Sequence, residues 1–358
     1  MGWTAAVAWA LLTTHFRPVF RTLHVKSRPV PGYPLPRASF GRLIELPDCE
    51  DAETVIAAVG ATPDALLDTF YGVNCLLVIK GMRAFADQPN LLVRLSQLFG
   101  DEVEDYRQTL TTAINIHPDV PQILVISNIS PAVPRIPALP TPPSTANGML
   151  PVRFPHRRGW HTDQSFRRPP PDISLFYAET PAPKGQGQTL YADGIGAYEA
   201  LNTETKTRIE SLEGLHISPG KGRAEYSVKA GEKPMELAQN ERPQPLVRMH
   251  PVTNKRALFL CEAGQMDWVE GPIVDMEPGI NGDGAKLIYE LMAHYTAPEF
   301  TYIHEWDAGD LVIYDNRSTI HTATWYDAET VQRRMWRTTV WGNPGPLYDG
   351  ELRSWIAQ

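Results

Sequence analysis

The sequence predicts a mainly β fold with flanking helices, arranged as a β-sandwich or a β-barrel. Eight runs of apolar and β-branched residues, each four to six residues long, are distributed along the chain. The 33 prolines and 26 glycines supply turns between such runs and argue against a bundle of long helices. Apolar residues make up 42% of the 358 residues, an ordinary globular content that can form a large core.

Each predicted strand is a short apolar run, such as Leu-Leu-Val-Ile-Lys at 76–80 or Gln-Ile-Leu-Val-Ile-Ser at 122–127. Further strands are predicted at 173–178, 189–192, 246–250, 257–260, 311–314 and 335–340. Other segments are typical of helices, and these are predicted at 51–59, 63–71, 88–99, 196–201, 203–212 and 284–295. Because these helices fall between the strands, we expect them to flank the β structure.

The N-terminal part of the chain differs in charge from the rest. The first 44 residues contain no Asp or Glu and carry six Arg and Lys residues, although the whole chain has 41 acidic and 33 basic residues. We therefore expect residues 1–40 to be a basic, acid-free N-terminal extension, with a cleavable targeting leader as the alternative. Residues 41–358 are predicted to form a single domain. Its proline-rich segment 130–155 is predicted to be a long loop, either disordered or functional as a lid.

Composition excludes several classes of partner and location. The net charge of −8 argues against binding to nucleic acid, and no apolar run approaches the roughly 20 residues that span a membrane. Cys49, Cys75 and Cys261 are scattered and lack CxxC spacing, which excludes a disulfide framework and a zinc knuckle. This pattern indicates a reducing compartment. We expect a cytoplasmic protein, or a mitochondrial one if residues 1–40 are a transit peptide.

A candidate metal centre begins in the segment Gly-Trp-His-Thr-Asp-Gln-Ser-Phe at 159–166. In an extended strand His161 and Asp163 would point to the same face, so an imidazole and a carboxylate would converge. His321, which follows the predicted strand 311–314, is the candidate third ligand. Two histidines and one carboxylate form the facial triad that holds non-haem Fe(II) and leaves positions open for other ligands. A zinc-type hydrolase could use the same three ligands.

The remaining histidines have structural explanations in the sequence. His15, His24 and His216 lie among apolar or helical residues and are expected to be structural. His250, in His-Pro-Val-Thr-Asn, is expected to support a turn rather than to bind a metal. His117 could line a pocket or could be an ordinary loop residue.

Several blocks of sequence match a known family in order and spacing. They are Trp-His-Thr-Asp at 160–163, Gly-Gln-Thr-Leu-Tyr at 187–191 and the segments 194–201, 248–260, 309–321 and 332–342. Over about residues 40–345 the chain resembles the taurine dioxygenase-like (TauD/TfdA) family of Fe(II)/2-oxoglutarate-dependent dioxygenases. The resemblance implies a double-stranded β-helix, or jelly roll. It also implies Fe(2+), 2-oxoglutarate and O2 as cofactor and co-substrates, bound around His161, Asp163 and His321 as the catalytic metal ligands.

The distal carboxylate of 2-oxoglutarate needs a buried cation, and the planar fork of an arginine fits a carboxylate best. On a strand, Arg333 and Arg337 share a face, whereas Arg334 points the other way. The resemblance implies that Arg333, together with the hydroxyl of Thr189, holds 2-oxoglutarate, and that Arg337 reaches the substrate. The spacing from the last metal ligand exceeds that of the taurine enzyme by one residue, which keeps Arg334 as the alternative to Arg333.

The resemblance implies an oxidoreductase that oxidises a small molecule, by hydroxylation as the default outcome, and releases succinate and CO2. No counterpart of the family's sulfonate-binding polar residue is evident, so a carboxylate-bearing substrate is expected rather than taurine. Arginines flank the metal motif and could attract such an anion; they are Arg157, Arg158, Arg167 and Arg168. The alternatives are a non-catalytic jelly-roll binding protein and the zinc-type hydrolase. A homo-oligomer is possible.

Overall fold

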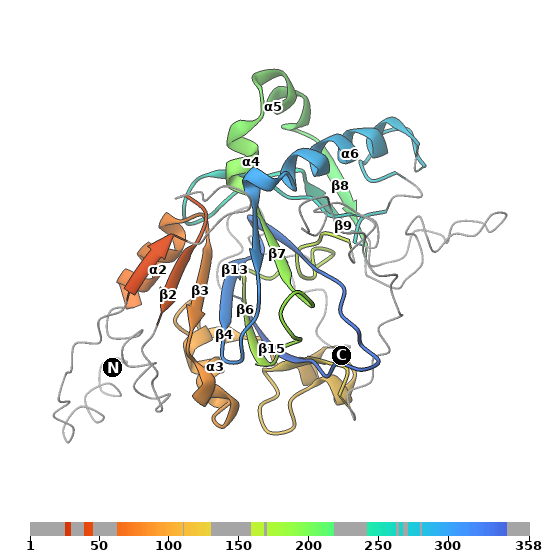
Figure 1. Ribbon diagram of the computed structural model, residues 1–358. Coiled ribbons are helices and arrows are strands. Elements are labelled where there is room, and N and C mark those ends of the chain that lie inside the picture. The colour runs from red at the N-terminus through yellow and green to blue at the C-terminus, as the bar shows by residue number, and fades with distance from the viewer. Residues whose placement is uncertain are drawn as a thin grey trace, which may run out of the picture.

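The structure, a computed structural model, describes residues 26–29, 39–45, 63–109, 111–129, 159–167, 170–217, 242–262, 265–267, 271–279 and 281–341 (Figure 1). The predicted helix 51–59 and the proline-rich segment 130–155 lie outside these residues. So does most of the predicted extension 1–40, of which Lys26–Pro29 forms strand β1. The expectations of a leader and of a lid therefore stay predictions.

The largest sheet has eight strands in the order β1-β2-β3-β13-β6-β15-β4, and β5 also pairs with β15. All the neighbouring strands are antiparallel except β2 and β3, which are parallel. Besides β1, the strands are β2 (Arg42–Glu45), β3 (Leu76–Lys80), β4 (Glu102–Val103), β5 (Leu124–Ser127), β6 (Ile173–Thr180), β13 (Leu311–Asp315) and β15 (Arg334–Trp341).

A smaller antiparallel sheet in the order β12-β7-β14 lies opposite the large one. Its strands are β7 (Thr189–Asp193), β12 (Thr301–His304) and β14 (Thr319–Ala323). Two further antiparallel pairs complete the β structure, and they are β8 (Glu213–His216) with β9 (Arg242–Pro245) and β10 (Val247–Met249) with β11 (Arg256–Leu258).

The helices lie outside the two sheets. In Figure 1, α4 (Gly194–Ala200), α5 (Thr203–Ile209) and α6 (Asp283–Tyr295) gather at one end of the molecule. By contrast, α2 (Pro63–Gly72) and α3 (Asn90–Ser96) lie beside the large sheet. Short 3-10 turns are formed by Arg83–Ala86, Tyr106–Gln108, Ala113–Asn115 and Pro298–Phe300.

Three buried clusters fill the spaces between these layers. One joins the outer face of the large sheet to α2 and α3, and includes Phe70, Leu92 and Leu175. A second packs α4 and α6 against β7, β11 and β14. The third lies between the two sheets and contains Val312 and Met335 from the large sheet and Tyr191 and Tyr302 from the small one. Burial of these apolar side chains between the layers is the main favourable contribution to folding.

The mainly β architecture with flanking helices confirms the sequence prediction. Eleven predicted elements are present with shifted ends, and the helix predicted at 88–99 is shortened to α3. Seven strands were not predicted from the sequence because they are short or rich in Thr, Glu and Pro; they are β1, β2, β4, β8, β9, β12 and β14. Within the described segments, no helix is both long enough and apolar enough to span a membrane.

His216, on β8, is a buried imidazole that stacks on Phe259 with ring centroids 5.3 Å apart. Neither ring nitrogen has a hydrogen-bond partner in the described part of the chain. Burial, with Arg248 nearby, lowers the pKa of His216 from 6.5 to about 3. The structural role expected from the sequence agrees with this setting.

We expect the protein to lose stability in mild acid because of His216. The unfolded chain binds a proton at this imidazole below its ordinary pKa, whereas the fold does not until near pH 3. The stability that depends on the neutral His216 imidazole is therefore fully present above about pH 6.5. The free energy of unfolding then falls by up to about 1.4 kcal/mol per pH unit as the pH drops toward 3. Urea denaturation at pH 7 and pH 5 should show a loss about 2 kcal/mol larger in the wild type than in His216→Leu. Equal losses in the two proteins would contradict this origin.

Candidate metal centre

A backbone bridge places the two candidate histidine ligands side by side. The His161 N–H donates to the His321 carbonyl at 3.0 Å, and the His321 N–H donates back to the His161 carbonyl at 2.7 Å. The two rings have centroids 4.3 Å apart. His321 lies on β14, and the pairing is an isolated antiparallel bridge. Residues 160 positions apart in the sequence are thereby fixed as direct cross-strand neighbours.

The prediction that His161 and Asp163 lie on one regular strand is wrong. Only His161 is bridged, and the chain turns at Asp163, where Gln164 adopts a left-handed φ of 50°. The turn forms because the Asp163 N–H donates to the side-chain oxygen of Asn316 at 3.2 Å rather than to a neighbouring strand.

The three candidate ligands nevertheless converge. Asp163 Oδ1 is 3.8 Å from His321 Nε2, and one ligand atom from each of His161, Asp163 and His321 lies within 4.8 Å of the others. His161 Nδ1 is 3.1 Å from the Gly159 carbonyl, which can only accept a hydrogen bond. Nδ1 therefore carries the proton, and Nε2 has the lone pair that a metal needs.

The charge states of these groups fit a metal site. Burial, and secondarily His161, lowers the pKa of His321 to about 3, so its imidazole is neutral at pH 7. Burial alone would raise the pKa of Asp163, but Arg337, His321 and His161 together hold it below its ordinary value. The neutral imidazole of His321 and the ionised carboxylate of Asp163 belong to the donor set that suits non-haem Fe(II).

Arg337, on β15, lies directly beside the candidate ligands. Its Nη1 donates to Asp163 Oδ1, and Tyr106 is a further hydrogen-bond partner of its guanidinium. Burial would lower the pKa of Arg337, but Asp163 raises it above its ordinary value, so the group is a permanent cation. The sequence analysis assigned Arg337 to the substrate, and its position next to the three ligands is compatible with that role.

Arg333 is a buried cation with an unsatisfied donor. Its side chain is buried, and the central guanidinium carbon lies 5.6 Å from the centre of the Tyr326 ring. The Arg333 Nε has no hydrogen-bond partner within the described ranges. Gly187, at a φ of 61°, leaves room for it, since a Cβ there would lie 3.4 Å from Arg333 Nε. A buried charge without a counter-ion is costly. Such a group is therefore a fitting receptor for a carboxylate ligand.

The other residues assigned from this part of the sequence have different surroundings. Arg334 is one-third exposed and lies 3.7 Å from Glu179, so its charge already has a carboxylate partner. Thr189 is buried on β7, and its hydroxyl oxygen accepts a hydrogen bond from Trp306 Nε1 at 3.0 Å. Because an accepting hydroxyl still has its own proton to donate, Thr189 keeps a donor for a carboxylate.

Of the four arginines that flank the metal motif, the structure describes Arg167, which is not a solvated cation. Arg157, Arg158 and Arg168 lie outside the described residues. Arg167 is buried, is paired with Glu104 at 2.5 Å and packs over the ring of Trp341. Its charge is neutralised locally and is not available to attract a substrate from solution.

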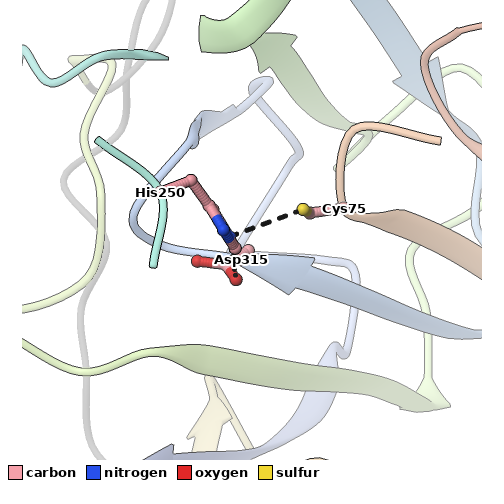
Figure 2. A group of neighbouring side chains, drawn as sticks. All are labelled: Cys75, His250 and Asp315. Carbon is pink, nitrogen blue, oxygen red and sulfur yellow. Dashed lines mark hydrogen bonds and ion pairs between the residues drawn. The ribbon is translucent and has the colours of Figure 1, made fainter. Parts of the chain in front are cut away.

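A second group of potential ligands is formed by Cys75, His250 and Asp315, whose ligand atoms lie within 4.8 Å of one another. Figure 2 shows how the three side chains lie together. His250 Nδ1 accepts the N–H groups of Val252 and Thr253 at 3.2 and 3.1 Å, so its proton is on Nε2. That proton points to Asp315 at 3.0 Å.

The same carboxylate also accepts two hydrogen bonds from the guanidinium of Arg317, at 2.5 and 2.8 Å, and one from its backbone N–H at 2.9 Å. A ring nitrogen that donates, and a carboxylate already paired with a guanidinium, are poor metal ligands. We assign this cluster a structural role, and the contacts of His250 agree with the turn support expected from the sequence.

A family model described as "Taurine catabolism dioxygenase TauD, TfdA family" matches residues 64–339. The chain belongs to the TauD/TfdA family. Membership confirms the resemblance drawn from the sequence blocks. Fe(2+), 2-oxoglutarate and O2 are the cofactor and co-substrates that this family implies.

Two curated relatives of this TauD/TfdA-family chain depend on alpha-ketoglutarate. It is 32% identical over 191 residues to the (S)-phenoxypropionate/alpha-ketoglutarate-dioxygenase of Sphingobium herbicidovorans. It is 33% identical over 188 residues to the alpha-ketoglutarate-dependent 2,4-dichlorophenoxyacetate dioxygenase of Cupriavidus pinatubonensis. The matches cover 52% and 51% of this chain. They span 63% and 59% of the relatives, which is less than two thirds of either one.

Solved structures share the fold over most of this TauD/TfdA-family chain. A taurine dioxygenase from Burkholderia xenovorans matches with a TM-score of 0.59 and 23% identity, covering 93% of this chain and 95% of that one. AAD-2 in complex with Mn(II) and N-oxalylglycine matches with a TM-score of 0.57 and 27% identity, covering 89% of this chain and 98% of that one.

Proposed function

We propose that this protein is an Fe(II)- and 2-oxoglutarate-dependent dioxygenase that hydroxylates a small, carboxylate-bearing molecule. The observation that carries the proposal is the convergence of His161, Asp163 and His321, together with Arg333, a buried arginine whose Nε has no hydrogen-bond partner in the described part of the chain. The three ligands fit Fe(II), and the arginine fits the distal carboxylate of a keto diacid.

In this proposal each residue has a defined task. His161, Asp163 and His321 hold Fe(II), while Arg333 and the hydroxyl of Thr189 bind the distal carboxylate of 2-oxoglutarate. Bound iron and 2-oxoglutarate together supply the activation of O2, with release of succinate and CO2 and oxidation of a substrate C–H bond. The aromatic side chains between the sheets, among them Tyr191 and Tyr314, are fully buried and exclude water from the ligands.

Arg337 supports an anionic substrate. Its guanidinium reaches the metal ligands from β15, so an anion bound to it would be held beside the reacting centre. The substrates named for the two curated relatives, a phenoxypropionate and a dichlorophenoxyacetate, are carboxylates. We infer a substrate of the same charge, with hydroxylation as the default outcome.

Three further properties are part of the proposal: the type of β fold, the cellular location and the binding partner. We propose that the facing sheets form a double-stranded β-helix, or jelly roll, as the family implies. The cytoplasm is the proposed location because Cys75 and Cys261 are free, buried thiols, as in a reducing compartment. The small-molecule substrate is the proposed partner, and a homo-oligomer stays a prediction.

The proposed function is tested by anaerobic titration of the full chain with Fe(II) and 2-oxoglutarate. A visible charge-transfer band that requires both components is expected, followed by iron-dependent succinate release when O2 is admitted. The absence of a band and of succinate would end the proposal. Zn(II)-dependent hydrolysis in their place would favour the hydrolase alternative, and binding without turnover would favour the non-catalytic one. A set of small carboxylic acids that accelerate succinate release would identify the substrate class.

Arg333→Ala is expected to raise the KM for 2-oxoglutarate by about 100-fold, because truncating one member of a buried charge pair costs about 2–5 kcal/mol. The matched control is Arg334→Ala, which removes an arginine already facing Glu179 and should change the KM less than about threefold. Succinate formation at varied 2-oxoglutarate measures both values. The reverse pattern would transfer the role to Arg334.

A further inference from the structure

The two carboxylate oxygens of Asp163 have different surroundings. Oδ2 accepts hydrogen bonds from the Tyr314 hydroxyl at 2.7 Å and from the Ser174 hydroxyl at 3.0 Å. Oδ1 faces His321 Nε2, 3.8 Å away, and the guanidinium of Arg337. One oxygen is therefore held by two neutral donors, while the other accepts from the Arg337 guanidinium and faces the His321 ligand atom.

The direction of the Ser174 hydroxyl is fixed by Asn316. The Asn316 amide nitrogen donates to Ser174 Oγ at 2.9 Å, so the serine proton is left to point at Asp163. The Asn316 amide itself cannot be reversed without loss, because its oxygen accepts from the Asp163 N–H at 3.2 Å. The result is a one-way chain from Asn316 through Ser174 to Asp163 Oδ2.

The strands bring these donors together. Tyr314 on β13 is paired in register with Ser174 on β6, so the two hydroxyls start from adjacent positions of the large sheet. Tyr314 and Asn316 are two residues apart on one side of the chain, whereas Asp315 points to the opposite side, toward His250 and Arg317. The buried cluster around Asp315 thereby holds the segment that presents Tyr314 and Asn316.

We propose that Tyr314 and Ser174, oriented by Asn316, are positioning residues that make Asp163 bind the metal through Oδ1 alone. This inference rests on the proposed metal site. A keto acid would chelate the bound ion through two atoms, and the reaction would need a further open position on it. A carboxylate that bound through both oxygens would occupy a position that the reaction needs. Donors that occupy Oδ2 prevent this and fix the orientation of the ligand.

The test is Mn(II) binding to the full chain, followed by the electron paramagnetic resonance signal of the unbound ion. Tyr314→Phe removes one donor at Oδ2 with little change of shape, and we expect the Kd for Mn(II) to rise about 10–100-fold. Ser174→Ala is a second, smaller variant with the same expected direction. The matched controls remove buried hydroxyls elsewhere: Tyr177→Phe, whose hydroxyl donates to the Met82 carbonyl, and Ser96→Ala, whose hydroxyl donates to the Leu92 carbonyl.

A second readout separates positioning from general weakening of the fold. In protein saturated with Mn(II), the Kd for 2-oxoglutarate should rise further in Tyr314→Phe with Ser174→Ala combined, because Oδ2 can then compete for the metal. Variants that bind both Mn(II) and 2-oxoglutarate within twofold of the wild type would overturn the proposal while leaving the metal site intact. A wild-type chain that binds no Mn(II) would instead refute the proposed function itself.

Discussion

His161→Ala is expected to abolish the Fe(II)- and 2-oxoglutarate-dependent absorption band and to reduce succinate release below detection. The imidazole is one of three protein ligands, and structural zinc sites bind with about 10–16 kcal/mol over four ligands. One ligand thus accounts for about 2.5–4 kcal/mol there, and Fe(II) binds more weakly than zinc, so we expect metal affinity to fall by about 100-fold. Anaerobic titration of wild type and variant measures the difference.

His117→Ala provides the matched control for this prediction. His117 packs against the edge of Trp336 at 5.2 Å and accepts the N–H groups of Asp119 and Val120. Trp336 belongs to the cluster on the outer face of the large sheet, away from the cluster that contains Tyr191 and Tyr314. The variant should keep the band. A band that survived in His161→Ala and disappeared in His117→Ala would require a different metal site.

The candidate metal ligands could be assigned from sequence because they lie in blocks with recognisable order. The family resemblance grouped His161, Asp163 and His321, but the strand expected at His161 and Asp163 was partly wrong. Asp163 lies in a turn rather than a strand, since its N–H is held by Asn316 instead of a neighbouring strand. A carboxylate two residues after a histidine can reach the same point through either geometry.

The partners of Asp163 could not be predicted from local sequence. Tyr314 and Ser174 are 140 residues apart, and only the register between β13 and β6 makes them neighbours. A shift of that register by one residue would place different side chains on the metal side of the sheet. For the same reason, the ion pair between Arg167 and Glu104 could not be predicted, because Glu104 lies in a segment without a clear strand pattern. Pairing between distant strands decides such contacts, and a single sequence does not encode it visibly.

Arg317→Met is expected to destabilise the protein by about 3–5 kcal/mol. Arg317 is only 2% exposed, and it bridges Asp315, at 2.5 Å, and Asp172, at 3.3 Å. Its removal leaves two buried carboxylates without their cation, and unpaired buried charge is the costly outcome of breaking such a cluster. Urea denaturation at pH 7 measures the free energy of unfolding. Arg256→Met, which breaks an exposed pair with Glu210, is the control and should cost less than about 1 kcal/mol.

The energetics of the Arg317 cluster can be separated from simple loss of packing by a double-mutant cycle. If the cost arises from an uncompensated carboxylate, Asp315→Asn combined with Arg317→Met should cost less than the sum of the single variants, by about 1–3 kcal/mol. A purely additive cycle would contradict the electrostatic origin. Because Asn316 lies between the two residues, Arg317→Met should also weaken Mn(II) binding while the variant is still folded. The cluster in Figure 2 would then support the metal site by holding the end of β13 in place, without binding a metal itself.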